Sequence, residues 1–173
     1  YEAGASRLPF AVLRGYVGTD FAAVNPEIRS VTCPFTGDEL AAVPAINPDI
    51  TFIHALKADR AGNVLIEGIT GVQKEAVLAA GKAVVTVEET VDSLDPHPNA
   101  LVLPHWVVTA IAEVPGGAHP SYAHGYYPRD NATYRAWDAI SADRARFLDW
   151  MKTHVIDEDA RVFATRVAKL TDG

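Results

Sequence analysis

Hydrophobic and polar positions along the chain predict short strands in the first two thirds and helices at the end. Continuous apolar runs at 49–56 and 83–87 are rich in β-formers, which is typical of strands covered on both faces of a sheet. Between them, segment 72–80 carries helix formers with apolar residues on one side and ends at Gly81. A strand, a loop, a helix and a strand over residues 50–87 form a βαβ-like unit, which implies a parallel crossover.

Shorter patterns complete the predicted elements. Helices are expected over 131–155, as one long amphipathic helix, and over 157–170. Further extended segments are expected at 10–13, 29–34, 39–44, 64–66, 100–103 and 106–114. No internal linker divides the chain, so the prediction is a single α/β domain over residues 1–173 with an open, mainly parallel sheet flanked by helices.

Composition narrows the class of protein. The 173 residues are 49% hydrophobic and 21% charged, as in a folded globular domain. The formal charge of −7 argues against nucleic-acid or anionic-membrane binding, so an anionic ligand needs a local site. Cys33 is the only cysteine, and no apolar run approaches the roughly 20 residues of a membrane span. We therefore expect a soluble, cytoplasmic protein.

The histidines do not predict a metal centre. His119 and His124 share a loop, while His97 and His105 flank a proline-rich connector, and no third ligand stands at a recognisable spacing. We expect no metal. His54 lies within an apolar run, which favours a hydrogen-bonded core or interface histidine.

Two glycine-bearing loops are candidates for binding an anion through backbone N–H groups. Gly116 and Gly117 permit such a nest, although a structural turn at a strand end is favoured. Gly68 and Gly71 precede a predicted helix start, where anion binding and a plain turn are equally open.

Carboxylates at strand ends are the remaining candidates for chemistry. Glu67 follows an extended segment and is a weak candidate catalyst, with an exposed structural acid favoured. Glu88 and Glu89 close another strand and point to opposite faces, so at most one of them can serve one pocket. An aromatic group suits a core or subunit interface better than adenine stacking: Tyr122, Tyr126, Tyr127, Tyr134 and Trp137.

Five segments in order resemble the α (A) subunit of family I CoA-transferases, nearest the glutaconate CoA-transferase type. They are Thr-Cys-Pro-Phe-Thr-Gly at 32–37, His-Ala-Leu-Lys-Ala-Asp-Arg-Ala-Gly-Asn-Val at 54–64, Gly-Val-Gln-Lys-Glu-Ala-Val at 71–77, Val-Thr-Val-Glu-Glu-Thr-Val-Asp at 85–92, and Pro-Gly-Gly-Ala-His-Pro-Ser-Tyr-Ala-His-Gly-Tyr-Tyr at 115–127. The resemblance implies an open α/β fold of the CoA-transferase (NagB/RpiA-like) type and a homologous β subunit, usually in an α2β2 assembly.

The resemblance also implies a reaction. CoA moves from an acyl-CoA to a free (di)carboxylic acid through a glutamyl-CoA thioester, with coenzyme A as substrate and no permanently bound cofactor. The catalytic glutamate belongs to the β subunit, within a Ser-Glu-Asn-Gly-like motif that this chain lacks. The residues expected to wall the cleft and bind substrate are Gly62, Asn63, Gly68, Gly71, Gln73, Gly116, Gly117, His119 and Ser121.

Two alternative functions stay open, and the resemblance also predicts which portion of the subunit the chain represents. Some members of the family hydrolyse CoA thioesters of steroid-ring fragments, and related α/β scaffolds serve as non-catalytic metabolite-binding domains. The glycine-rich Gly-x-Gly-Gly-Phe motif expected near the start of an α subunit is absent. We therefore expect the chain to correspond to the C-terminal portion of an α subunit.

Overall fold

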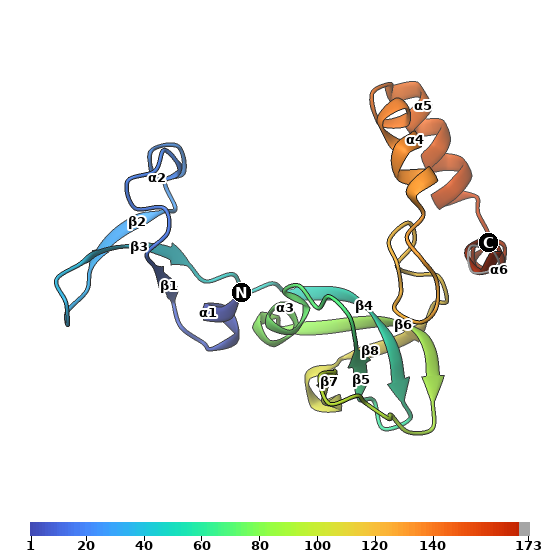
Figure 1. The fold of residues 1–173 in the computed structure, drawn as a ribbon, viewed down its shortest axis with the longest axis horizontal. Helices are drawn as coiled ribbons and strands as arrows, with labels where there is room; N and C mark the ends of the chain where they lie inside the picture. The colour runs from blue at the N-terminus through green and yellow to red at the C-terminus, as the bar shows by residue number, and fades with distance from the viewer. Residues whose placement is uncertain (170–173) are drawn as a thin grey trace. The chain divides into compact units, whose positions relative to one another are not determined.

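The computed structural model describes residues 1–169, whose helices and strands are labelled in Figure 1. The chain divides into two compact units. The first unit comprises Tyr1–Ile53, Thr70–Val84 and Val107–Thr109. The second comprises His54–Ile69, Val85–Trp106 and the described residues from Ala110 onward. Two strands of the main sheet begin in the first unit and end in the second.

The first unit contains a three-stranded antiparallel sheet in the order β1-β3-β2. The sequence predicts all three strands, and the turn that joins β2 to β3 closes where Cys33 N–H donates to the Asp38 carbonyl and Gly37 N–H to that of Cys33. Gly37 has a φ of +75°, which only glycine adopts readily. The elements are α1 (Glu2–Ala5), β1 (Phe10–Leu13), α2 (Phe21–Val24), β2 (Arg29–Thr32) and β3 (Glu39–Pro44).

The main sheet has five strands in the order β7-β5-β4-β6-β8. Its strands are β4 (Ile50–Asp59), β5 (Val64–Ile66), β6 (Lys82–Val91), β7 (Leu101–Leu103) and β8 (Ala110–Glu113), and α3 (Gln73–Ala79) connects β5 to β6. These elements confirm the predicted strand, helix, strand order over 50–87.

Strands β4, β6 and β8 run in the same direction. In the first unit Lys82 N–H donates to the Asp49 carbonyl at 3.1 Å. In the second unit a ring nitrogen of His54 lies 2.8 Å from the Thr86 hydroxyl. The residue number therefore rises in the same direction along β4 and β6, as in a parallel pair. Between β6 and β8, Thr109 N–H donates to the Ala83 carbonyl and Val114 N–H to the Val87 carbonyl.

The expectation of a mainly parallel sheet needs one correction, because β5 is reversed and the sheet is mixed. Strand β5 pairs antiparallel with both β4 and β7. The reason is local: a tight turn at Arg60–Asn63 joins β4 to β5, and so short a connection joins only antiparallel neighbours. The α/β class is confirmed.

The predicted long helix over 131–155 is wrong. The structure has two helices, α4 (Asn131–Ser141) and α5 (Arg144–Met151), followed by a π-helical turn, Lys152–Ile156. Asp143 divides them because its side chain accepts from Arg146 N–H and begins a new helix. A further helix, α6 (Ala160–Ala168), confirms the last helix, although Leu170 lies outside the described residues.

The predicted strand at 106–114 begins later than expected. His105–Val107 form a short 3-10 helix, and β8 begins only at Ala110. The β-branched residues of this segment favour a strand by propensity, but only part of the segment reaches a neighbouring strand to pair with.

The second unit has a core that explains its apolar runs. Val64, Val85, Val87 and Leu103 are fully buried on the sheet. A further cluster joins Leu56 of β4 to Ala123, Tyr127 and Val167, with Phe163 packed against it. This cluster holds the loop after β8 and helix α6 against the end of the sheet that carries the candidate site.

Candidate functional site

Glu88 is the most deeply buried acid of the candidate site. It follows Val85 and Val87 on β6 and is 5% exposed, whereas its neighbour Glu89 is exposed. The two side chains therefore point to opposite sides of the strand, as predicted. Burying a carboxylate is costly unless hydrogen bonds replace its water, so its partners define the site.

Three donors from three different segments converge on the Glu88 carboxylate. The His54 ring nitrogen Nε2 on β4 lies 2.7 Å from Oε1, and the Tyr127 hydroxyl donates to the same oxygen at 2.5 Å. Gly116 N–H donates to Oε2 at 2.6 Å. An ionised carboxylate only accepts, so His54 Nε2 carries the proton, and the other nitrogen meets the Thr86 hydroxyl.

These contacts set the charge state of the cluster. Burial raises the pKa of the Glu88 carboxyl, but the hydrogen bonds from His54, Tyr127 and Gly116 outweigh burial and hold the pKa below its ordinary value. Burial and the neighbouring Glu88 raise the pKa of Tyr127 well above that of a free phenol. At neutral pH the pair is therefore a carboxylate and a neutral phenol.

The Gly116–Ser121 loop uses its backbone N–H groups internally. Gly116 N–H binds Glu88, and Ala118 N–H donates to the Tyr127 hydroxyl at 2.9 Å. The N–H groups of Gly117, His119 and Ser121 donate to the carbonyls of Val114, Gly116 and Ala118. The loop does bind an anion, but the anion is the protein's own Glu88, which supports the structural-turn interpretation.

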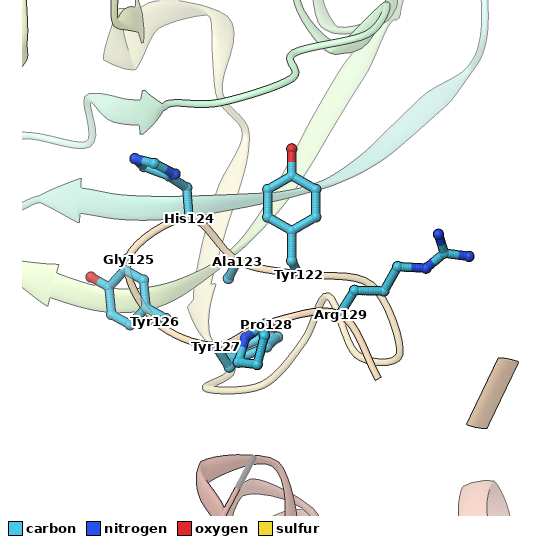
Figure 2. A pocket seen from close by; sticks show the side chains of 8 residues that line it. All are labelled: Tyr122, Ala123, His124, Gly125, Tyr126, Tyr127, Pro128 and Arg129. Atoms are coloured by element: carbon cyan, nitrogen blue, oxygen red, sulfur yellow. The ribbon is translucent and has the colours of Figure 1, made fainter. Parts of the chain in front are cut away.

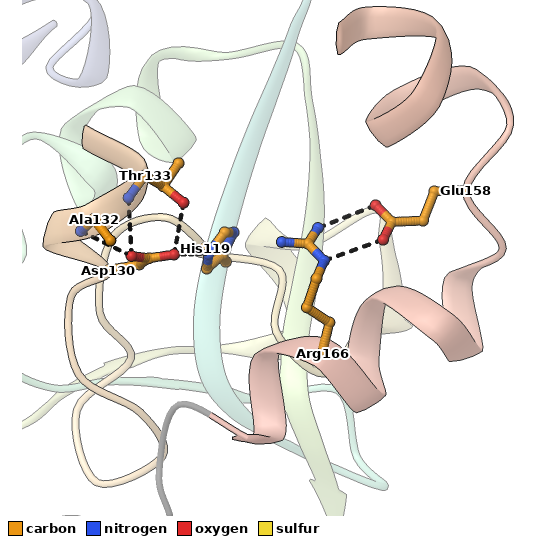
Figure 3. Close-up of polar contacts among 6 residues, drawn as sticks. All are labelled: His119, Asp130, Ala132, Thr133, Glu158 and Arg166. Carbon is orange, nitrogen blue, oxygen red and sulfur yellow. Dashed lines mark hydrogen bonds and ion pairs between the residues drawn. The ribbon is translucent and has the colours of Figure 1, made fainter. Parts of the chain in front are cut away.

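His119 fastens the far end of this loop to helix α4 (Figure 3). Its side chain is 7% exposed, and its Nε2 lies 3.0 Å from Oδ2 of Asp130. Asp130 also caps α4 by accepting from the N–H groups of Ala132 and Thr133. Hydrogen bonds from the Thr133 side chain and backbone, and then from His119, hold the pKa of Asp130 far below its usual range.

The segment Tyr122–Arg129 lines an open hollow of about 540 Å³ (Figure 2). The Tyr122 and His124 rings project from one side of the segment, while Arg129 extends away from it. Gly68 lies beside them, since a Cβ there would be 3.5 Å from the Tyr122 hydroxyl, and that hydroxyl accepts from Ile69 N–H at 3.4 Å. Glu67 immediately precedes Gly68, at the end of β5, and is half-buried.

The aromatic group divides between core and cavity. Tyr127 is buried in the core, as expected, and Tyr126 donates to Glu89, which also pairs with Lys57. Trp137 packs edge-on against Trp150. A cavity of about 450 Å³ is lined by His119, Pro120, Thr133, Tyr134, Trp137, Trp150, His154, Val155, Phe163 and Arg166.

The remaining predicted site residues have structural surroundings. Asn63 donates to Asp59 from its backbone and its amide, and its side-chain oxygen accepts from His105 N–H, so Gly62-Asn63 is a braced turn. Gly71 and Gln73 lie in the first unit, at the start of α3. Gly62, Asn63, Gly68, Gly116, Gly117, His119 and Ser121 all lie in the second unit. The substrate-binding role of each stays a prediction.

Sequence reasoning missed the partnership of Glu88, His54 and Tyr127. Each carried a signal: an acid ending a buried strand, a histidine within an apolar run and a tyrosine after a glycine loop. Their convergence depends on the register of β4 against β6, which periodicity does not reveal.

Within residues 1–169, no three His, Cys, Asp or Glu side chains gather as possible metal ligands. No helix in the same range is long and apolar enough to span a membrane.

Comparison with known proteins identifies the class to which this fold belongs. Residues 1–114 match the family described as Coenzyme A transferase, and the chain belongs to that family. Over all 173 residues it is 56% identical to the α (A) subunit of 3-oxoadipate CoA-transferase from Pseudomonas knackmussii, of which it covers 61%. These findings confirm the predicted resemblance to the α (A) subunit of family I.

Two further relatives extend the comparison. The crystal structure of glutaconate coenzyme A-transferase from Acidaminococcus fermentans matches with a TM-score of 0.86 at 27% identity, over 98% of this chain and 61% of that chain. The cholesterol ring-cleaving hydrolase IpdA subunit of Mycobacterium tuberculosis (strain H37Rv) is 29% identical over 92% of this chain and 58% of its own length. The chain thus spans about three fifths of these relatives, and which portion of the subunit it represents stays a prediction.

Proposed function

We propose that the protein containing this chain is the α (A) subunit of a two-subunit CoA-transferase that moves CoA between an acyl-CoA and a free dicarboxylic acid. The observation that carries the proposal is 56% identity along the whole chain to the corresponding subunit of a 3-oxoadipate CoA-transferase. The transferase name of the structure with a TM-score of 0.86 supports the same chemistry. A 3-oxo dicarboxylic acid is accordingly the first acceptor to test.

The attacking glutamate is proposed to come from the partner subunit. A nucleophilic carboxylate must reach the thioester carbonyl with a free oxygen. Glu88 is buried, and three hydrogen bonds engage both its oxygens. Glu89 is engaged by Lys57 and Tyr126, which leaves the half-buried Glu67 as the one weak candidate from the sequence.

In this proposal the chain shapes the pocket rather than attacking the substrate. The hollow at Tyr122–Arg129 offers a phenol, an imidazole and a guanidinium, groups that suit the carboxylates of a dicarboxylic acid. Coenzyme A enters as a substrate, with no permanently bound cofactor. We expect an α2β2 assembly with a homologous subunit, working in the cytoplasm.

The test is a transfer assay on the complete protein co-expressed with its partner. A dicarboxylyl-CoA is supplied with 3-oxoadipate, acetate or glutaconate as acceptor, and each new CoA thioester is quantified by mass spectrometry. The proposal predicts transfer that depends on both subunits and on the acceptor acid. Absence of transfer to every acid, with the complex assembled, overturns it.

The second candidate function is hydrolysis of a cyclic or branched acyl-CoA. It is favoured by the similarity to the IpdA hydrolase subunit. The same assay separates the two functions, since a hydrolase releases free CoA without an acceptor acid. Without an acceptor, a transferase consumes acyl-CoA only until its own glutamate carries the thioester, and it turns over only when an acceptor is present.

A further inference from the structure

We infer that Glu88 is a positioning residue for the CoA-transferase reaction: with His54 and Tyr127 it fixes the Gly116–Ser121 loop and, through that loop, the Tyr122–Arg129 wall of the hollow. This inference rests on the proposed function. Its starting observation is that one buried carboxylate collects donors from strand β4, from the loop after β8 and from the tyrosine segment.

The carboxylate holds the loop at two points. Gly116 N–H reaches Glu88 directly at 2.6 Å. Ala118 N–H reaches it through the Tyr127 hydroxyl, which accepts at 2.9 Å from Ala118 and donates at 2.5 Å to Glu88. Two alternate N–H groups of one loop thus depend on a single buried acceptor, so a change at Glu88 reaches both.

His54 sets the height at which the loop lies over β4. A Cβ built on Gly117 would stand 2.6 Å from ring atoms Cε1 and Nδ1 of His54, so the glycine backbone lies directly against the imidazole. The ring is fixed in turn by Thr86 on one nitrogen and Glu88 on the other. Glu88 therefore orients the surface on which the loop rests as well as binding the loop.

The loop connects Glu88 to the wall of the hollow. Near the C-terminal end of the loop, His119 contacts Asp130. The segment between these points, which includes the buried Ala123 and Tyr127, lines the hollow. An arrangement anchored at both ends holds Tyr122 and His124 in place without Glu88 touching the substrate.

The test uses the assembled enzyme and the variant Glu88→Gln, which preserves size but replaces one acceptor oxygen with a donor. An amide at this position leaves at least one of the three donors facing another donor. The matched control is Glu113→Gln, because exposed Glu113 also accepts a backbone N–H, from Thr90 at 2.8 Å. Tyr127→Phe is a second variant that removes only one hydroxyl.

We expect Glu88→Gln to lower kcat for transfer by about tenfold or more, with KM for the acyl-CoA little changed, because leaving a buried N–H unsatisfied is costly. Glu113→Gln should stay within about twofold of wild type, as surface substitutions do. Equal kcat in Glu88→Gln and Glu113→Gln, with both complexes assembled and thermally stable, overturns the inference. If Glu88→Gln fails to fold, a wild-type kcat in Tyr127→Phe overturns it.

Amide hydrogen exchange separates this inference from the proposed function. Faster exchange at Gly116 and Ala118 in Glu88→Gln or Tyr127→Phe, relative to Glu113→Gln, supports the anchoring role even if the enzyme transfers no CoA. Unchanged exchange at both amides in both variants contradicts the anchoring role even if transfer is active.

Discussion

Replacing Gly117 with alanine tests the packing at the centre of the site. The added methyl group would stand 2.6 Å from two atoms of the His54 ring and 3.0 Å from the Val114 carbonyl oxygen. A Cβ atom essentially never lies so close to another heavy atom. The His54 ring cannot move away without lengthening its hydrogen bonds to Thr86 and Glu88. The substitution must therefore disturb either the loop or the cluster.

The magnitude follows from two costs. Overpacking a well-packed position costs about 1–3 kcal/mol. Weakening one hydrogen bond of a buried charged group adds about 1–3 kcal/mol. We expect Gly117→Ala to lower the free energy of unfolding by about 2–4 kcal/mol, since some relaxation is shared between the two costs.

The assay is urea unfolding of the assembled protein at one fixed concentration, so that dissociation contributes equally to every variant. Gly15→Ala is the control, because its nearest neighbour to an added Cβ is Leu13 at 3.6 Å and its φ is unstrained. The cost of Gly117→Ala should shrink in a His54→Ala background, where the clashing ring is absent. A cost below about 0.5 kcal/mol, as at an ordinary surface site, would refute the reasoning.

Three further predictions address the charges and the chemistry. Tyr127→Phe should lower the free energy of unfolding by about 1–2 kcal/mol, measured by urea unfolding, because Ala118 N–H and Glu88 each lose a partner. Asp130→Asn should cost about 1 kcal/mol at pH 7. The pKa of Asp130 is lower in the folded than in the unfolded protein, so its carboxylate stabilises the fold above the unfolded pKa near 4 and loses this contribution as the pH falls through the folded pKa. The difference in free energy of unfolding between wild type and Asp130→Asn should therefore narrow in unfolding curves below pH 4. Glu67→Gln should keep the transfer rate within about threefold of wild type, in the range of a surface change; abolished transfer would instead make Glu67 the nucleophile.

Much of the fold follows from local sequence pattern. Continuous apolar runs predict the strands at 49–56 and 83–87, and apolar residues on one side predict the helix between them. The structure confirms all three. The break at Asp143 escapes the same reasoning because the amphipathic pattern continues past it. What starts a new helix there is a local hydrogen bond from Arg146 N–H to the Asp143 side chain.

The site was less accessible to sequence reasoning. Alternation along a strand places Glu88 and Glu89 on opposite faces, but it does not say which one is buried. The Gly116-Gly117 pair allows two interpretations, an anion-binding nest and a structural turn. In both of them the backbone N–H groups beside the glycines need an acceptor. Only the structure shows that the acceptor is Glu88, on a strand fixed by long-range register.

The most direct test of the central claim is to locate the covalent CoA adduct that the enzyme forms with its acyl-CoA. The complete two-subunit enzyme is incubated with a dicarboxylyl-CoA without acceptor, quenched in acid, digested and analysed by mass spectrometry. Our account predicts a glutamyl-CoA thioester on a peptide of the partner subunit, with none on this chain. A thioester on Glu67 or any other acid of this chain, or steady release of free CoA without an adduct, would contradict it.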